Sequence, residues 1–312
     1  MKKISLKVQI GKLHLENPVM VASGTFGYAE EFKDFVDLKK LGAMVTKTIT
    51  LRPREGNPVP RTCETPSGML NSIGLENPGI DRFIAQRLPI LKKIGIPIIV
   101  SISSIDDPQE FLILARQLDK IKAVYAIELN ISCPNIKGTG HRAQGTGLIA
   151  QGAKATYELV KAVRQVTQKT LITKLSPNVT DINEIALAAE QAGTDAVALV
   201  NTFLAMAIDI EKKRPRIAMV TAGLSGPAIR PIAVRMVWEV YNKIKIPIIG
   251  MGGIMDTQDA LEFIIAGATA VNIGTANFIN PKATVEIIKG IEGYFSERKI
   301  NNINSLKGSL NL

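Results

Sequence analysis

A cysteine in the middle of the chain stands where it could transfer a proton. Cys133 follows Asn130 and the apolar run 126–131, and it precedes a glycine-rich segment at 138–147. A thiol with a pKa of about 8.5 can act as a nucleophile or as a general base near neutral pH. Most cysteines only pack in a core, which is how we interpret Cys63. The position of Cys133 at the end of an apolar run favours a chemical role, next to a loop of the kind that closes over active sites.

The positions of the histidines leave two reactions open for this cysteine. His14 lies in an early hairpin and His141 lies in the glycine-rich segment, so neither ends an apolar run. A Cys–His pair for acyl transfer therefore has no positional support, although distance in sequence does not forbid one. Abstraction of a proton by Cys133 is at least as well supported.

Two lysines at the ends of apolar runs suggest an anionic ligand. Lys47 and Lys174 each follow such a run directly. Burying an unpaired ammonium is costly, so each lysine should have an anionic partner. That partner is either a local carboxylate or negative charge on a ligand, such as a reduced flavin ring. The sequence leaves both possibilities open.

Two glycine turns indicate a phosphate site. Gly252 and Gly253 follow one apolar run, and Gly274 with Thr275 follows the next. Glycines allow backbone N–H groups to approach phosphate oxygens, and two such turns at adjacent strand ends favour a phosphorylated ligand over simple tight turns. No G-x-G-x-x-G motif opens a helix after a strand, so a Rossmann dinucleotide site is not supported.

The segment 71–79 offers amides, a hydroxyl and free backbone N–H groups within one turn. Such a loop can hold a carboxylate or an imide through several hydrogen bonds. Capping of the following helix is the simpler interpretation of this segment on its own. The residues in question are Asn71, Ser72, Ile73, Gly74 and Leu75.

The elements that would position these groups follow an alternating pattern. Segments with helical spacing, such as 107–118, 152–166, 182–192, 229–244 and 257–266, separate most of the apolar runs. This pattern predicts a single α/β domain, a (β/α)₈ TIM barrel over residues 1–312, with an open doubly wound sheet as the alternative. The polar residues that end the runs favour the barrel, because its strand ends all open on one face. The apolar runs are 19–22, 43–46, 97–100, 126–131, 171–174, 196–200, 247–249 and 270–273.

The ends of the chain and its net charge bear on its terminal structure, its location and its possible ligands. Residues 1–16 predict a short N-terminal β-hairpin, and the tail 296–312 is expected to fray. The start lacks the apolar core of a secretory signal, and no stretch is long enough to span a membrane, so we expect a cytoplasmic protein. The net charge of +10 is compatible with nucleic acid, an acidic partner or small anions, and the basic stretch 211–216 is interpreted as a solvated loop.

With these motifs in place, the sequence resembles the class 1 dihydroorotate dehydrogenases, and within them the catalytic subunit of the NAD-linked type 1B. The resemblance extends in order over nearly the whole barrel. It rests on residues 17–27, 46–48, 71–79, 130–135, 174–178, 201–202, 223–227, 252–253 and 274–275.

The resemblance implies an FMN-dependent oxidation of dihydroorotate to orotate in pyrimidine biosynthesis. Cys133 would take the proton from C5 while C6 passes a hydride to flavin N5. Ser101 stands where the family has an asparagine, so a flavin contact is expected there only weakly. The resemblance places the FMN phosphate near Gly226, Gly252, Gly253, Gly274 and Thr275, and the rest of the flavin along Ser23, Lys47, Thr48, Asn130, Lys174 and Val200. It places the substrate at Lys47, Asn71, Ser72, Ile73, Gly74, Leu75, Asn130, Asn201 and Thr202.

The resemblance also implies a partner. Type 1B enzymes pass electrons to a second subunit that carries FAD and a 2Fe–2S cluster, in a heterotetramer of two catalytic and two electron-transfer chains. A cluster normally takes four thiolates, and this chain has two cysteines, so the cluster must lie elsewhere. Two rivals stay open: a dihydrouridine synthase-like FMN enzyme acting on RNA, and a non-catalytic phosphate-binding barrel. No RNA-binding domain is visible after the last apolar run, which disfavours the first.

Overall fold

Eight parallel strands form the centre of the molecule. The computed structural model describes residues 4–105, 107–132 and 151–311. The strand order is β3-β16-β15-β10-β9-β8-β7-β4, and a bridge between Met20 and Ala43 joins the two ends of the sheet into a barrel. The prediction of a (β/α)₈ barrel is therefore confirmed. The strands are β3 (Val19–Val21), β4 (Met44–Val45), β7 (Ile98–Ile102), β8 (Val124–Asn130), β9 (Thr170–Lys174), β10 (Ala196–Leu199), β15 (Ile248–Met251) and β16 (Ala270–Ile273).

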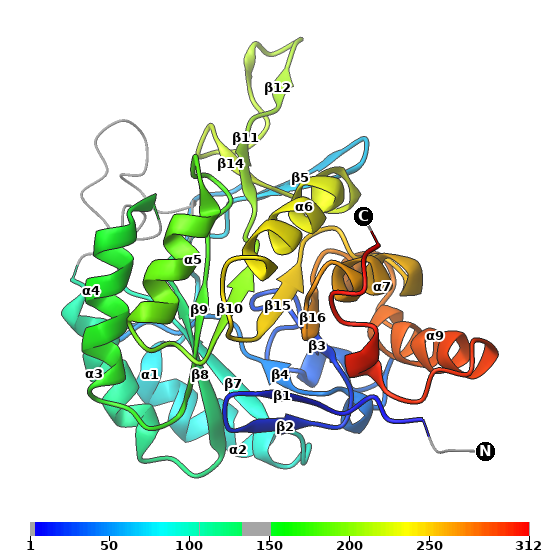
Figure 1. The fold of residues 1–312 in the computed structure, drawn as a ribbon. Helices are drawn as coiled ribbons and strands as arrows, with labels where there is room; N and C mark the ends of the chain where they lie inside the picture. The colour runs from blue at the N-terminus through cyan, green and yellow to red at the C-terminus, as the bar shows by residue number, and fades with distance from the viewer. Residues whose placement is uncertain (1–3, 106, 133–150, 312) are drawn as a thin grey trace.

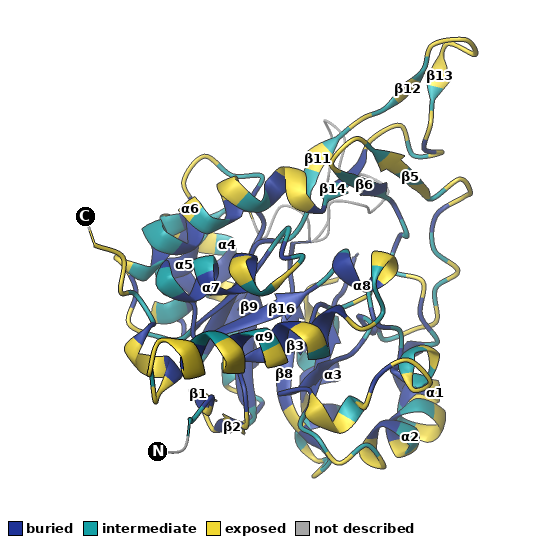
Figure 2. Ribbon diagram, turned by 90° about the vertical axis from the view of Figure 1, so that its right-hand side faces the viewer, coloured by how far each residue is buried: buried dark blue, intermediate teal, exposed yellow. Residues whose placement is uncertain are grey.

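Helices surround the barrel on its outside (Figure 1). Nearly every barrel-strand residue is buried, and the helices bury one apolar face while their other face is exposed, as Figure 2 shows. Parallel strands covered on both faces need continuous apolar runs, which is why these runs were readable in the sequence. The α-helices and the π-helical turn are α1 (Gly79–Arg82), the π-helical turn (Phe83–Arg87), α2 (Leu88–Lys92), α3 (Gln109–Asp119), α4 (Ala153–Arg164), α5 (Ile182–Gln191), α6 (Arg230–Tyr241), α7 (Thr257–Ile265), α8 (Ala276–Ile279) and α9 (Ala283–Glu297). Short 3-10 helices lie at Glu30–Phe32, Leu38–Lys40, Pro227–Ile229 and Ile303–Ser305.

A hairpin closes the end of the barrel where the strands begin. Strands β1 (Val8–Ile10) and β2 (Leu13–Leu15) pair antiparallel, with Gly11 at the turn. The backbone N–H of Lys12 donates to the Thr170 hydroxyl at the start of β9, at 3.0 Å. A Cβ on Gly11 would lie 2.8 Å from Asp195 Cβ, so only glycine fits this contact. The hairpin covers one end of the barrel, and apolar side chains fill its interior. The open end is therefore the opposite rim, where the barrel strands end.

A second sheet lies above that opposite rim, and the sequence did not predict it. Its strands are β11 (Phe203–Ala205), β14 (Ala222–Ser225), β6 (Gly68–Asn71) and β5 (Thr62–Thr65), in that order. An exposed two-stranded arm, β12 (Ile208–Asp209) and β13 (Arg214–Pro215), extends from it (Figure 1). The basic stretch 211–216 lies on this arm, and residues 211–214 are exposed, as a solvated loop should be.

The two ends of the chain pack against each other. The backbone N–H of Ser5 donates to the carbonyl of Asn301, and Ile303 donates back to Ser5. Ile303 is buried, so residues 301–306 are attached to the barrel although the sequence predicted fraying for the tail. Among the described residues, no helix combines the length and apolar character that crossing a membrane would require.

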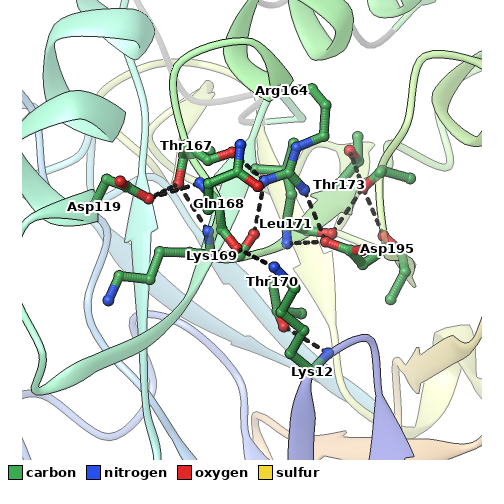
Figure 3. Close-up of polar contacts among 12 residues, drawn as sticks. Lys12, Asp119, Arg164, Thr167, Gln168, Lys169, Thr170, Leu171, Thr173 and Asp195 are labelled. Atoms are coloured by element: carbon green, nitrogen blue, oxygen red, sulfur yellow. Dashed lines mark hydrogen bonds and ion pairs between the residues drawn. The ribbon is translucent and has the colours of Figure 1, made fainter.

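A polar network holds the strand-start end together (Figure 3). The carboxylate of Asp195 accepts from the Arg164 guanidinium at 2.9 Å and from the Leu171 backbone N–H at 2.8 Å. Asp119 accepts from the Thr167 hydroxyl and from the Gln168 backbone, both at 2.7 Å. Although burial opposes it, these hydrogen bonds hold the pKa of Asp119 below its usual value. The network joins the loops before β9 and β10 to the end of α3.

We expect Asp195→Ala to lower the free energy of unfolding by about 2 kcal/mol, because it removes the carboxylate partner of the partly buried Arg164 guanidinium and the acceptor of the Leu171 backbone N–H. Urea unfolding followed by circular dichroism measures this loss. Glu158→Gln is the matched control, since its ion pair with Lys154 is exposed and should contribute less than about 0.5 kcal/mol. Equal midpoints for the two variants would contradict the prediction.

Candidate functional site

A cavity of about 560 Å³ opens at the carboxyl ends of the barrel strands, under the second sheet. This volume is within the range of cofactor and ligand pockets. Residues from most barrel strands and from β6 line it, so side chains far apart in the sequence converge there. The predicted site residues that line it are Ser23, Lys47, Thr48, Asn71, Ile73, Gly74, Leu75, Asn130, Lys174, Val200, Asn201, Thr202, Gly252, Gly253, Gly274 and Thr275.

Tight backbone packing marks the side of the cavity after β15 and β16. Gly252 and Gly253 have φ values of 123° and 80°, which side chains rarely adopt. A Cβ on Gly253 would lie 2.7 Å from the Gly226 carbonyl and 2.9 Å from the Arg230 backbone nitrogen. The Thr275 hydroxyl, at the end of β16, donates to Ser225 Oγ at 2.8 Å. Glycine thus allows the loop after β15 to approach the start of α6, in the geometry that backbone phosphate sites use.

Hydroxyl and amide groups form a chain across the other side of the cavity. The Thr48 hydroxyl lies 3.0 Å from the hydroxyls of Ser23 and Ser101, and it accepts from Asn130 Nδ2 at 3.0 Å. Ser101 is fully buried and does not line the cavity. Its place is behind Thr48, so it can orient the Thr48 hydroxyl but is not positioned to contact a ligand itself.

The two lysines form no ion pair with any described residue. Lys174 is 5% exposed, at the end of β9 beside Asn130 of β8. Lys47 is half-buried, and burial lowers its pKa, with Glu76 opposing the shift and Arg61 adding to it. The local salt bridge that the sequence left open is therefore absent among the described residues. Two ammonium groups facing one cavity favour an anionic or electron-rich ligand.

The loop after β6 is held in shape by its own hydrogen bonds. The Asn57 side chain donates to the Ser72 hydroxyl at 2.9 Å, and Ser72 is fully buried. Gly74 and Leu75 have φ values of 76° and 57°, and both line the cavity. Ser72 therefore supports the loop and does not line the cavity, unlike Asn71, Gly74 and Leu75.

Arg61 fixes both flanks of this loop. Its guanidinium donates to the carbonyls of Asn57 and Glu55, at 2.5 and 2.7 Å, and to the Glu76 carboxylate at 2.5 Å. The Arg61 side chain thus joins the segment before β5 to Glu76, which follows Leu75. This role of Arg61 was not predictable from the sequence, because the pairing depends on the fold of the loop.

Asn201 connects the end of β10 with the end of β8. Its Nδ2 donates to the Ser132 hydroxyl at 2.9 Å and to the Ser132 carbonyl at 3.1 Å. Its Oδ1 accepts from the Thr202 backbone N–H at 2.8 Å. These bonds attach Ser132, the last described residue before Cys133, to Asn201, which lines the cavity. Cys133 itself, and the segment 137–150, lie outside the described residues.

The structure differs from the predicted site at a few positions. Gly226 does not line the cavity, although its carbonyl lies close to Gly253. Ser72 and Ser101 lie behind the lining, for the reasons given above. Several lining residues were not predicted, because they are apolar or lie within a strand and carry no local signal: Ala22, Met69, Met251, Asn272 and Phe278.

Comparison with known proteins adds independent information. The model of the dihydroorotate dehydrogenase family matches residues 5–295. The chain is similar to proteins named dihydroorotate dehydrogenase B (NAD(+)), catalytic subunit, from three bacteria. It is 54% identical to that of Trichlorobacter lovleyi over 308 residues, covering 99% of both chains. It is 52% identical to that of Bacteroides thetaiotaomicron over 307 residues, covering 98% of both. It is 50% identical to that of Caldicellulosiruptor saccharolyticus over 309 residues, covering 99% of this chain and 100% of the relative.

Proposed function

The chain belongs to the dihydroorotate dehydrogenase family, and from this premise we propose that it oxidises (S)-dihydroorotate to orotate in pyrimidine biosynthesis. It would be the catalytic subunit of an NAD-linked, type 1B enzyme. One observation carries the proposal beyond kinship. Lys47, Lys174, the glycine turns and the Asn71 loop, which are far apart in the sequence, line a single cavity.

The cavity suits FMN as the cofactor. Gly252 and Gly253 line the cavity beside Gly274 and Thr275, so a phosphate bound there would lie against the backbone of these turns. Lys174 is buried and forms no ion pair with any described residue, which suits the electron-rich end of a flavin. When bound, FMN would supply the acceptor for a hydride. The flavin would also lie along Ser23, Lys47, Thr48, Asn130 and Val200.

The substrate would occupy the part of the cavity under the second sheet. Dihydroorotate carries a carboxylate and an imide, which need several donors and acceptors at fixed positions. Asn71, the backbone of Gly74 and Leu75, and the side chains of Asn130 and Asn201 offer such groups at one place. Lys47 supplies a cation for the carboxylate. Thr202 would complete the site, since its buried hydroxyl has no partner among the described residues.

Cys133 would act as the general base that removes the C5 proton. The support is its position in the sequence, directly after Ser132, whose hydroxyl and carbonyl bind Asn201 at the cavity wall. A base next to the substrate must lie within hydrogen-bond reach of the proton it abstracts. The ammonium groups of Lys174 and Lys47 would stabilise the negative charge that develops during the transfer.

The electrons would leave through a partner subunit. Two cysteines cannot hold an iron–sulfur cluster that takes four thiolates, so a 2Fe–2S cluster would be carried by a second chain. That chain would also carry FAD, as the resemblance to type 1B enzymes implies. The relatives' names contain both "catalytic subunit" and NAD(+), which supports such a partner. We propose a heterotetramer of two catalytic and two electron-transfer chains.

The visible spectrum of the purified chain tests the proposal. We expect flavin absorbance that is bleached when dihydroorotate is added without air. A colourless protein that also fails to bind added FMN would contradict the proposal and favour a non-catalytic barrel. A bound flavin that dihydroorotate does not bleach, together with salt-sensitive tRNA binding, would favour an RNA-modifying enzyme instead.

A further inference from the structure

Asn272 has a buried side-chain amide without a partner. It lies in β16, is 1% exposed, and lines the cavity. Neither its Nδ2 nor its Oδ1 forms a hydrogen bond with any described residue. Leaving a buried donor and a buried acceptor unsatisfied is unfavourable, so buried amides nearly always have partners. Both missing partners therefore point to a molecule that occupies the cavity.

The residues beside Asn272 cannot satisfy it. The sheet register aligns it with Met251 of β15 on one side and Met20 of β3 on the other. Both are buried, and a thioether is only a weak acceptor with no hydrogen to donate. The amide thus projects from an otherwise apolar part of the cavity floor. It needs a ligand group that can both donate and accept, which is the property of an alcohol hydroxyl.

The position of Asn272 along β16 indicates which part of the ligand would contact its side chain. Gly274, on the proposed phosphate side, is two residues further along the chain, or about 7 Å for an extended strand. On the other side, β3 leads to Ser23, on the proposed ring side of the cavity. Asn272 therefore lies between the phosphate and ring positions. In FMN, the group that links the phosphate to the ring is the ribityl chain, a polyol.

We propose that Asn272 binds the ribityl chain of FMN, donating to one hydroxyl oxygen and accepting from a hydroxyl. This inference rests on the proposed FMN site and adds to it a side chain that forms hydrogen bonds with the polyol linker. It makes Asn272 a cofactor-binding residue with no part in proton or hydride transfer.

Binding of FMN and of its monodeoxy ribityl analogues to the apoprotein tests the proposal, with flavin fluorescence as the readout. Asn272→Leu keeps a similar volume and removes both polar groups. We expect it to weaken FMN binding about tenfold, the loss that corresponds to a hydrogen bond or two. At least one deoxy analogue should bind the wild-type chain about tenfold more weakly than FMN, and this difference should disappear in the variant.

Thr284→Val is the matched control, because Thr284 is also a fully buried polar residue without a side-chain partner among the described residues, but it does not line the cavity. It should bind FMN as the wild type does. Wild-type FMN affinity in Asn272→Leu would overturn the inference but not the proposed function. The inference would also be overturned if every deoxy analogue lost as much affinity in the variant as in the wild type. That result would indicate that Asn272 binds a water or has a packing role. Failure of the wild-type chain to bind FMN would overturn the inference together with the proposed function.

Discussion

Cys133→Ala is expected to bind FMN normally while losing about 10²- to 10⁴-fold in turnover near neutral pH, the range for removal of a general base. The reason is that nothing else predicted at the site has a pKa suited to taking the C5 proton at that pH. Steady-state oxidation of dihydroorotate by the reconstituted enzyme measures the loss, and the flavin spectrum verifies that the cofactor is present.

Cys63→Ala is the control for this variant. Cys63 lies in β5, its thiol is directed to the Glu64 carbonyl, and it does not line the cavity. Its variant should retain wild-type turnover. Full activity of Cys133→Ala at pH 7 would remove Cys133 from the mechanism, whereas equal losses in both cysteine variants would indicate a general sensitivity of the fold.

Lys174→Met is expected to slow reduction of the bound flavin by dihydroorotate about 10²- to 10³-fold, the usual effect of removing one preorganised electrostatic group. Met keeps most of the aliphatic stem, so the packing inside the barrel is largely preserved. The expected loss arises because Lys174 is 5% exposed and its ammonium has no carboxylate partner among the described residues. Its charge is therefore available to stabilise negative charge in the cavity.

Single-turnover bleaching without air measures this step separately from reoxidation. Lys243→Met, an exposed lysine after α6, is the control and should reduce at the wild-type rate. Unchanged bleaching in Lys174→Met would contradict the proposed role. The variant could instead lose FMN while the fraction that retains it is reduced at the wild-type rate. That result would restrict the role of Lys174 to cofactor binding.

The barrel was predictable because its strands are buried on both faces. Runs such as 97–100 and 196–200 are continuously apolar, and each lies within one or two residues of a strand. The polar residues that follow them could be assigned to one rim from topology alone. Most of the predicted lining residues followed from this one rule.

The second sheet was not predictable in the same way. Strand β5 consists of Thr62, Cys63, Glu64 and Thr65 and alternates between exposed and intermediate burial, so it carries no strong apolar signal. Contacts that depend on the fold of loops were also hidden, such as Arg61 with Glu76 and Asn57 with Ser72. Asn272 was missed for the opposite reason, since it stands within an apolar run that was interpreted only as core.

Strand pairing in the second sheet couples two regions that the sequence separates by about 150 residues. Asn71 of β6 pairs with Gly223 of β14, and Met69 pairs with Ser225, whose Oγ accepts from Thr275. Strand pairing therefore joins the loop proposed for dihydroorotate to the loop beside the proposed phosphate, and we expect the two loops to move together. Filling of the phosphate position would stiffen the substrate loop in advance, so the apoenzyme should hold dihydroorotate poorly and assembly should proceed with the nucleotide first.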